Sequence, residues 1–569
     1  MAMINDRLIF AVLALAVCVV AHAQVPTSGT RTTERPVIGS IDGKVLNESG
    51  QPLAGASVFV RAVNAAINRT TITDLDGNFR VNGLETNLYI VSANSPAYTS
   101  APGDPDAPQY YRLGDSARVE MVRGGAITGT VTNALGEPMI AVRVRAIMIR
   151  DAKGQIQRTP NFGAFEQPTD DRGIYRIYGL APGTYLVSAG GSSYIPTSGM
   201  YETDIPTFAP SSTRDTAAEV SVRSGEDVDV DIRYRGEPGH SISGSVKILG
   251  PGNASLTLTR AGSGITVATT LQLPMMRGFV FSGLSDGDYD LVAQESFANP
   301  PSTQFTLAFS EPKRITVKGA DVTGIEVVTK PLGSISGKIL FEPTKAPECQ
   351  GKRPPLLAEM LVRFRRPDKE SEKADPLAVR LVSGSASPDS NGTFSLRNML
   401  AGKYQFEPRF YARYWYLQSM TMTSAGPKPQ RIDVAGNWTT LKPGEHLSNL
   451  NITLAEGAAS IRGAVPVTDA ALPPPAVVYL IPNGDKVEDV LRFFVTDVAD
   501  GTFTFNNVPP GKYLALTQST VDPQIANPAK LRQPDAVALR TKLRRTAETK
   551  KTEIELKPCE NLVDYQLKQ

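Results

Sequence analysis

The sequence predicts an all-β protein made of five β-sandwiches in tandem, and three observations support this prediction. Glycine and proline are abundant, with 48 and 43 copies in 569 residues, and aromatic residues are spread along the chain. Long segments of helical periodicity are nearly absent, whereas short segments that alternate apolar and polar residues are frequent. An opening motif also recurs every ~85 to 125 residues, which is the size of one sandwich.

The opening motif is an apolar residue, then x-Gly-x, then a second apolar residue. A Gly/Pro turn and a second strand follow it in the first two repeats, because glycine permits positive φ and proline fixes the next φ. The five openings are Ile41-Asp-Gly-Lys-Val45, Ile127-Thr-Gly-Thr-Val131, Ile242-Ser-Gly-Ser-Val246, Ile335-Ser-Gly-Lys-Ile339 and Ile461-Arg-Gly-Ala-Val465.

A longer motif in the middle of each repeat predicts two strands around two turns. In the second repeat we expect Asp171 and Gly173 to form the first turn and Pro182-Gly183 to form the second. Tyr175 and Tyr185 are expected to lie in the core. A closing pair of alternating strands brings each repeat to about seven strands, the number typical of a Greek-key sandwich.

These repeats divide the chain into seven predicted segments. In chain order they are a signal peptide at 1–23, a linker at 24–36, and sandwiches at 37–123, 124–236, 237–331, 332–457 and 458–569. One short helix is expected near the C-terminus, roughly from Pro528 to Thr546. Three segments rich in Pro, Gly, Ser and aromatic residues are expected to be long surface loops, namely Tyr98–Arg112, Tyr194–Thr216 and Phe410–Lys428.

The N-terminus has the pattern of a secretory signal peptide. Arg7 precedes an apolar segment from Leu8 to Val20, and Ala21-His22-Ala23 forms a small-x-small cleavage site before Gln24. A lipoprotein signal ending at Cys18 is the less favoured alternative. We therefore expect export to the periplasm, the cell surface or the medium, with no transmembrane span after the signal is removed.

Two cysteines remain after signal removal, Cys349 and Cys559. They can pair in an oxidising compartment, but they lie in different predicted sandwiches. We therefore expect stability to come from packed cores rather than from a disulfide.

The repeat motifs resemble those of the carboxypeptidase regulatory-like domain. The resemblance rests on the x-Gly-x-Val opening, the Gly-x-Pro strand, the Asp-x-x-Gly-x-Phe/Tyr turn and the Pro-Gly-x-Tyr hairpin, and it is closest in the first two repeats. It implies a transthyretin-like sandwich, similar also to collagen-adhesin B-type repeats and grouped with carbohydrate-binding-like folds. Such domains are spacers, adhesin stalks and accessory modules, so the resemblance implies a fold more than a function.

The residues needed for catalysis are not recognisable in the sequence. A zinc peptidase needs histidine and carboxylate ligands that converge on one metal, but His240 and His446 are isolated and lie in different repeats. The acidic segments Asp74–Asn78 and Asp170-Asp171 are interpreted as turns rather than calcium loops, because no distal Glu completes them. We expect no enzyme activity, metal or cofactor. The formal net charge of +2 also gives no indication of nucleic-acid binding.

One aromatic segment is the candidate ligand-binding site. Tyr411, Tyr414, Trp415 and Tyr416 lie close together, and aromatic faces stack on sugars or on peptide side chains. Strand alternation predicts that part of this segment packs in a core instead. The leading hypothesis is a non-catalytic exported binding or structural protein whose partner is a glycan or an envelope protein. The alternatives are a carbohydrate-binding protein with aromatic loops, and an accessory subunit or remnant of an exported peptidase.

Overall fold

The computed structural model describes residues 38–567, with gaps. The gaps are 64–66, 102–108, 158–165, 193–199, 251, 263–265, 273–277, 299–304, 368–383, 424–429, 466–475, 485–488 and 520–527. The expected signal peptide and linker lie outside the described residues. Among the described residues, no helix is long and apolar enough to cross a membrane.

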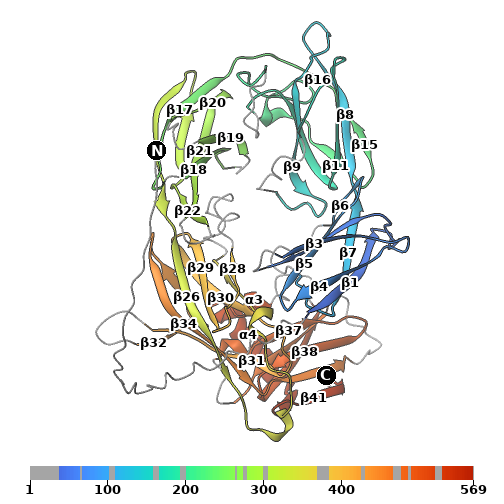
Figure 1. Ribbon diagram of the computed structural model, residues 1–569, viewed down its shortest axis with the longest axis vertical. Helices are drawn as coiled ribbons and strands as arrows, with labels where there is room; N and C mark the ends of the chain where they lie inside the picture. The colour runs from blue at the N-terminus through green and yellow to red at the C-terminus, as the bar shows by residue number, and fades with distance from the viewer. Residues whose placement is uncertain are drawn as a thin grey trace, which may run out of the picture. The chain divides into compact units, whose positions relative to one another are not determined.

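The described chain is mostly β, which confirms the predicted fold class, and its strands form ten sheets. We divide the strands into five groups of two sheets each, and Figure 1 shows them in chain order from blue to red. The first group contains β1 (Ile38–Asn47), β2 (Ser57–Ala62), β3 (Asn68–Ile72), β4 (Asn78–Glu85), β5 (Tyr89–Asn94), β6 (Tyr98–Ser100) and β7 (Ser116–Arg123). The second contains β8 (Gly125–Thr132), β9 (Arg143–Asp151), β10 (Glu166–Pro168), β11 (Ile174–Leu180), β12 (Gly183–Ala189), β13 (Thr207–Phe208), β14 (Val220–Val222), β15 (Asp227–Asp229) and β16 (Ile232–Arg233).

The remaining three groups follow in the same way. The third contains β17 (His240–Lys247), β18 (Asn253–Arg260), β19 (Thr266–Gln272), β20 (Gly278–Leu284), β21 (Gly287–Ala298), β22 (Phe305–Phe309), β23 (Lys313–Val317), β24 (Val322–Val328) and β25 (Lys330–Pro331). The fourth contains β26 (Gly333–Glu342), β27 (Leu361–Arg365), β28 (Ser385–Ala386), β29 (Thr393–Met399), β30 (Gly402–Arg409), β31 (Trp415–Thr423), β32 (Arg431–Asp433), β33 (Thr439–Leu441) and β34 (His446–Glu456). The fifth contains β35 (Ala459–Ala464), β36 (Ala476–Pro482), β37 (Phe494–Asp497), β38 (Thr502–Val508), β39 (Gly511–Ser519), β40 (Glu553–Leu556) and β41 (Asn561–Gln566), with helices α3 (Pro528–Leu531) and α4 (Val537–Lys550).

The number of strands varies between groups. Among the described residues the first and fifth groups have seven strands, whereas the middle three have nine. The additional strands come partly from insertions that we expected to be loops. In particular, the segment expected as a loop at Phe410–Lys428 contains β31, which pairs with β34 and extends the first sheet of its group. Trp415 at the start of β31 and Met420, Thr421 and Met422 near its end are buried, so this segment packs as a strand instead of forming a surface loop.

The five groups share one strand arrangement. The first strand of each group lies between a parallel neighbour from the end of the group and an antiparallel neighbour from its central hairpin. The parallel pairs are β1 with β7, β8 with β15, β17 with β24, β26 with β34 and β35 with β41. The antiparallel pairs are β1 with β4, β8 with β11, β17 with β20, β26 with β29 and β35 with β38.

The glycine of each opening motif is needed because the neighbouring strand approaches too closely for a side chain. A Cβ on Gly337 would fall on the carbonyl oxygen of Leu450 and only 2.7 Å from the ring of Phe394. The same two partners, a carbonyl of the closing strand and the Phe of the hairpin, meet Gly43 and Gly463. The opening glycine and the hairpin phenylalanine are therefore two halves of one packing contact.

The hairpin tyrosines are the second shared feature. Tyr175 and Tyr185 are buried, as expected. In each group the tyrosine in the Gly-x-Tyr position donates its hydroxyl to the carbonyl four residues earlier. This bond closes the turn that precedes the strand. The pairs are Tyr89 with Glu85, Tyr185 with Ala181, Tyr289 with Ser285, Tyr404 with Leu400 and Tyr513 with Pro509.

The aspartate of the first turn differs by one residue from the expectation. The carboxylate of Asp170, not Asp171, accepts from the N–H groups of Arg172 at 2.9 Å and Ile174 at 2.8 Å. A carboxylate two and four residues before its donors closes an Asx turn, and this fits Asp170. Asp74 and Asp389 have the same two contacts in their groups.

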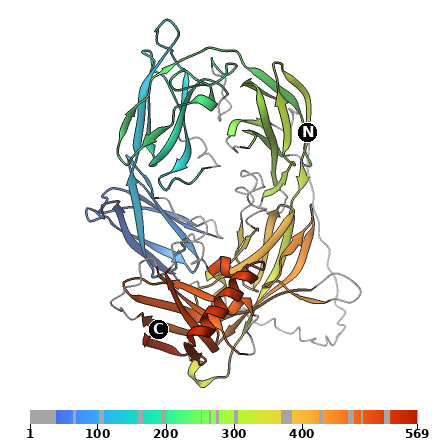
Figure 2. The same ribbon diagram turned by 180° about the vertical axis from the view of Figure 1, so that it is seen from behind.

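The C-terminal helical segment is divided in two. Helix α3 ends at Leu531 and α4 begins at Val537, because Pro534 between them cannot continue a helix. Helix α4 lies against the fifth group (Figure 2), with Leu543 and Ala547 buried in a cluster with Val477 and Leu514. This helix adds a second layer of core to the fifth group.

The expectation that Cys349 and Cys559 are not paired is wrong. The two residues form a disulfide with a Cα–Cα distance of 5.4 Å. Cys349 lies in the segment between β26 and β27, and Cys559 lies in the turn before β41. Sequence position placed the cysteines in different sandwiches, but the long β26–β27 connection reaches the fifth group.

Candidate functional site

The predicted aromatic segment lies where the fourth and fifth groups meet. Trp415 begins β31 and is 4% exposed, with its ring packed edge-on against Phe341 at 5.6 Å between centroids. It belongs to the core of the fourth group, so its ring has no open face in this conformation. The other three aromatic residues of the prediction are only half-buried.

Two grooves expose these three tyrosines. The first groove, of about 300 Å³, contains Tyr411 and Tyr416, and the second, of about 250 Å³, contains Tyr414. Both grooves are also lined by Asn506 and Asn507 of β38, so the two grooves are neighbours that share this part of the strand. We call the two together the junction groove. Each half is near the lower end of the range for small-molecule sites, about 300 Å³.

The irregularity in β38 at Asn506-Asn507 is a feature of the fold. Pairing between β35 and β38 shifts register here, and Asn507 has a φ of 57°. The equivalent residues of the first three groups, Gly83, Gly179 and Gly283, also have positive φ. Asparagine tolerates this conformation better than most residues do, and it adds an amide that glycine lacks.

Contacts from other segments hold the tyrosines in place. The guanidinium of Arg112 lies over the Tyr411 ring at 5.0 Å, and the ammonium of Lys352 lies over the Tyr414 ring at 4.7 Å. The Tyr414 carbonyl accepts from the N–H groups of Gly457 and Ala458 at 2.7 and 2.9 Å. Burial raises the pKa of the Tyr411 and Tyr416 hydroxyls, so both are neutral at ordinary pH.

The walls of the groove are joined covalently and by packing. The Cys349–Cys559 disulfide joins the fourth group to the fifth, and the Cys559 N–H donates to the Gly457 carbonyl at 3.1 Å. Val490 and Leu491 of the fifth group are buried in the core cluster of the fourth. A site formed on both groups therefore has a fixed geometry, which lowers the entropic cost of binding.

The lining of the groove is cationic. Four arginines line it, Arg409 and Arg532 in the first half and Arg413 and Arg462 in the second, and among the described residues no lining residue of either half is acidic. Beyond the lining, Glu407 pairs with Arg409 at 3.2 Å. Arg413 and Arg462 are exposed, and within the described part of the chain neither has an ion-pair partner.

Arg532 is held at the floor of the first half. Its Nε donates to the Phe493 carbonyl at 3.0 Å, and its guanidinium lies over the Phe494 ring at 4.6 Å. Burial lowers the pKa of this guanidinium, partly offset by Glu407 and Asp489. An anion that enters the groove would compensate this desolvation.

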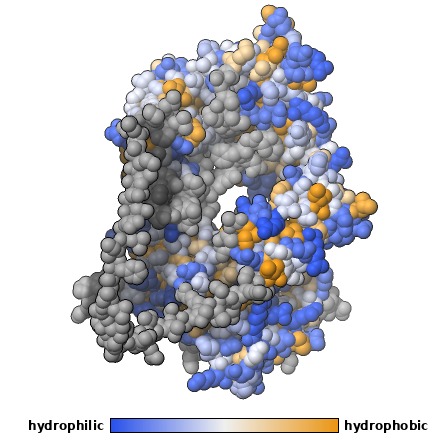
Figure 3. Space-filling model, in the orientation of Figure 1, coloured by the Kyte–Doolittle hydropathy of each residue, from blue (hydrophilic) through white to orange (hydrophobic). Residues whose placement is uncertain are grey.

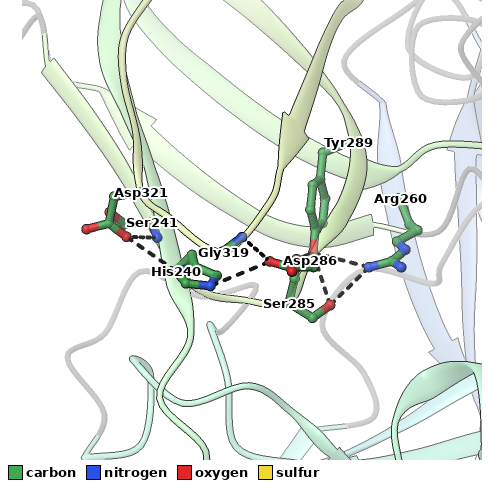
Figure 4. Close-up of polar contacts among 8 residues, drawn as sticks. All are labelled: His240, Ser241, Arg260, Ser285, Asp286, Tyr289, Gly319 and Asp321. Atoms are coloured by element: carbon green, nitrogen blue, oxygen red, sulfur yellow. Dashed lines mark hydrogen bonds and ion pairs between the residues drawn. The ribbon is translucent and has the colours of Figure 1, made fainter.

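The histidines were expected to be isolated, but the structure brings two carboxylates to His240 (Figure 4). Its Nε2 lies 3.5 Å from Asp286 and its Nδ1 lies 4.0 Å from Asp321. Each carboxylate also accepts a backbone N–H, from Gly319 at 2.8 Å and from Ser241 at 2.7 Å. Both ring nitrogens of His240 thus face carboxylates, and no nucleophile among the described residues is hydrogen-bonded to this imidazole as a catalytic triad requires.

The expected absence of a metal site can be examined in the described part of the chain. There, no group of three or more His, Cys, Asp or Glu side chains is arranged to hold a metal ion. The aspartates of the turns accept from backbone N–H groups instead. The Asn78 N–H is the main cause that lowers the pKa of Asp74, whereas the pKa of Asp170 is lowered first by the Arg172 side chain and then by the Ile174 N–H.

Comparison with known proteins identifies the first strand group. Residues 40–104 match the carboxypeptidase regulatory-like domain. This match confirms the resemblance for the first repeat, where the sequence motifs are most complete. No curated protein matches the chain in sequence.

Solved structures with related arrangements were also found. The Bacillus anthracis TIE protein is 15% identical, with 52% of this chain and 51% of that protein covered, at a TM-score of 0.14. This chain thus spans about half of that protein. The minor pilin GBS52 of Streptococcus agalactiae is 12% identical over 35% of this chain and 96% of its own, at a TM-score of 0.20. The shaft pilin SpaA of Lactobacillus rhamnosus GG is 12% identical over 35% and 98%, at 0.17. Likenesses at these scores carry no functional argument.

Several residues of the groove were missed by sequence reasoning. Asn506 and Asn507 occupy positions that are Asn-Gly, Tyr-Gly and Ser-Gly in the first three repeats, and this departure was a usable signal. Arg462 precedes the glycine of the opening motif in the fifth repeat, at a position where the motif does not specify a residue type. Arg532 follows the short helix α3 and reaches the groove only through the tertiary fold.

Proposed function

We propose that the chain is a non-catalytic exported protein of the cell envelope or extracellular space, made of five tandem β-sandwich domains with the boundaries predicted above, that binds and positions a partner. The observation that carries this proposal is how the repeat motifs are used. Their aspartates, glycines and tyrosines are engaged in turns and packing, so the repeated residues maintain the fold. A binding role must then come from residues that differ between groups, as the junction groove does.

The lining of the groove supports binding rather than catalysis. Its polar residues in the described part of the chain are tyrosine, asparagine, arginine, serine and threonine, with no histidine, aspartate or glutamate among them. General acid–base chemistry at neutral pH uses those missing groups most often. The test is a panel of peptide, glycoside and ester substrates with the full chain. We expect no turnover above a buffer control, and turnover that tracks purified protein would contradict the proposal.

The disulfide supports export. Disulfides persist mainly in oxidising compartments outside the cytosol, and Cys349 and Cys559 are both buried. Expression of the full sequence in a bacterial host, followed by fractionation and N-terminal sequencing, tests this point. We expect the exported form to begin at Gln24, and retention of an uncleaved chain in the cytosol would contradict it.

Carbohydrate binding is the second candidate function, and Tyr411 and Tyr416 in one groove favour it. Sugar rings stack on aromatic faces, and the Asn506 and Asn507 amides can bond to sugar hydroxyls. A glycan array tests the candidate with Tyr416→Ala, and Tyr178→Ala on an exposed strand position of the second group is the control. We expect Tyr416→Ala alone to lose binding. If instead an exported peptidase co-purifies and no glycan binds, the accessory-subunit alternative is favoured.

A further inference from the structure

We infer that the junction groove selects a carboxylated glycan, that is, a polysaccharide rich in uronic acids. This inference rests on the proposed carbohydrate binding and adds the charge class of the ligand. It is carried by three features that occur together in the groove, namely tyrosines, side-chain amides, and arginines with no acidic residue beside them in the described lining.

The aromatic and amide groups of the groove indicate that its ligand is a sugar. Tyr411 and Tyr416 line one half and Tyr414 lines the other, and the two halves share Asn506 and Asn507. A chain of sugar rings that spans both halves would meet a tyrosine in each. Ser460 and Asn561, which are bonded to each other at 2.6 Å, line the second half and add further hydroxyl and amide groups.

The arginines define the charge. The whole chain is nearly neutral, with 59 Lys and Arg against 57 Asp and Glu, yet the described lining of the groove has four arginines and no acidic residue. A planar guanidinium matches a carboxylate with two parallel hydrogen bonds. Arg413 and Arg462 are exposed in the second half without an ion pair in the described residues, so their donors are available.

The contacts of the four arginines assign different tasks to them. Arg532 is hydrogen-bonded to the Phe493 carbonyl and Arg409 is paired with Glu407. These two arginines therefore contribute to the electrostatic potential of the first half but are not free to move toward a ligand. Arg413 and Arg462 are attached only by their own strands and loops. The second half is therefore where a carboxylate is bound directly.

The test compares polygalacturonate with its carboxyl-reduced, neutral form by affinity electrophoresis and calorimetry on the full chain. We expect tighter binding of polygalacturonate, and a fall in its affinity as salt is raised, since exposed charge pairs are screened. The double variant Arg413→Ala/Arg462→Ala should weaken polygalacturonate binding about tenfold and leave the neutral form within about twofold. Arg61→Ala, an exposed arginine of the first group, is the matched control.

The outcomes separate this inference from the function on which it rests. Equal binding of both polymers would overturn charge selection while leaving glycan binding intact. Binding of neither polymer by folded protein would overturn both proposals. Polygalacturonate binding that persists in the arginine double variant and in Tyr416→Ala would show that the site lies elsewhere, and would overturn the assignment to this groove.

Discussion

The Cys349–Cys559 disulfide gives the most quantitative prediction. It closes a loop of 210 residues in sequence, and the loop-closure model assigns about 5 kcal/mol to such a crosslink at 25 °C, the upper end of the observed range. Replacing both cysteines by alanine should therefore destabilise the joined fourth and fifth groups by an amount up to this value. The shared core at Val490 and Leu491 is left in place, so the two groups should still fold together.

Tryptophan fluorescence measures this effect selectively. The chain has two tryptophans, Trp415 and Trp438, and both lie in the fourth group. With a denaturant dependence of about 5 kcal/mol/M in guanidinium chloride for a unit of this size, the midpoint should fall by about 1 M. Wild-type protein unfolded in reductant should match the variant. A midpoint that moves by less than about 0.2 M would refute the reasoning, because the crosslink would then contribute almost no loop-closure free energy.

Three further predictions concern the repeated motifs. Gly337→Ala should destabilise the fourth group by about 2 kcal/mol or more, since the new Cβ overlaps the Leu450 carbonyl. Gly278→Ala is the control, because the nearest atom to its new Cβ is 3.7 Å away, and it should leave the unfolding transition measured by Trp fluorescence unchanged. Equal effects of the two substitutions on that transition would contradict the packing role of Gly337. Tyr404→Phe should lower the free energy of unfolding by about 1 kcal/mol, because the Leu400 carbonyl loses its donor at 2.5 Å. Tyr416→Phe is the control. If the two variants do not differ in unfolding followed by fluorescence, the bond from Tyr404 to the Leu400 carbonyl does not stabilise the fold. Burial raises the pKa of Tyr175, Tyr185 and Tyr513 above the unfolded value of about 10. The stability that these neutral phenols contribute is therefore complete below about pH 10 and is lost as pH rises toward their folded pKa. The phenolate absorbance of these residues should rise late and together with unfolding, and early titration of them without unfolding would contradict their burial.

The fold was predictable because its signals are local and repeated. The opening glycines, the Asp-x-x-Gly turns and the Gly-x-Tyr hairpins each place one residue type at a fixed spacing, and five copies allow the repeats to be aligned by eye. What the pattern did not reveal was why each residue is needed. The contact between Gly337, Phe394 and Leu450 joins positions more than a hundred residues apart, and no window of sequence contains it.

The candidate site was only partly predictable. The run from Tyr411 to Tyr416 was conspicuous in composition, but its alternation did not reveal that Trp415 points into the core while Tyr416 lines a groove. The opposite wall comes from the fifth group, and its position depends on the disulfide and on Leu491. The two aspartates beside His240 are likewise 46 and 81 positions away from it, beyond any spacing rule.

The proposed binding function does not depend on hydrophobic association between copies of the chain. Exposed large apolar side chains such as Leu75, Leu135 and Met200 belong to separate turns and loops. On the face seen in Figure 3, apolar residues are interspersed among polar ones. The groove, rather than an apolar face, is therefore the feature on which the proposed binding function depends.

The most direct test of the central claim is a hydrogen-exchange footprint of the full chain with and without polygalacturonate. If the groove binds this polymer, amide exchange should slow in three segments that line the groove, 408–417, 458–462 and 504–509, with little change in the first three strand groups. Protection confined to other segments, or binding without any protection at the groove, would contradict it.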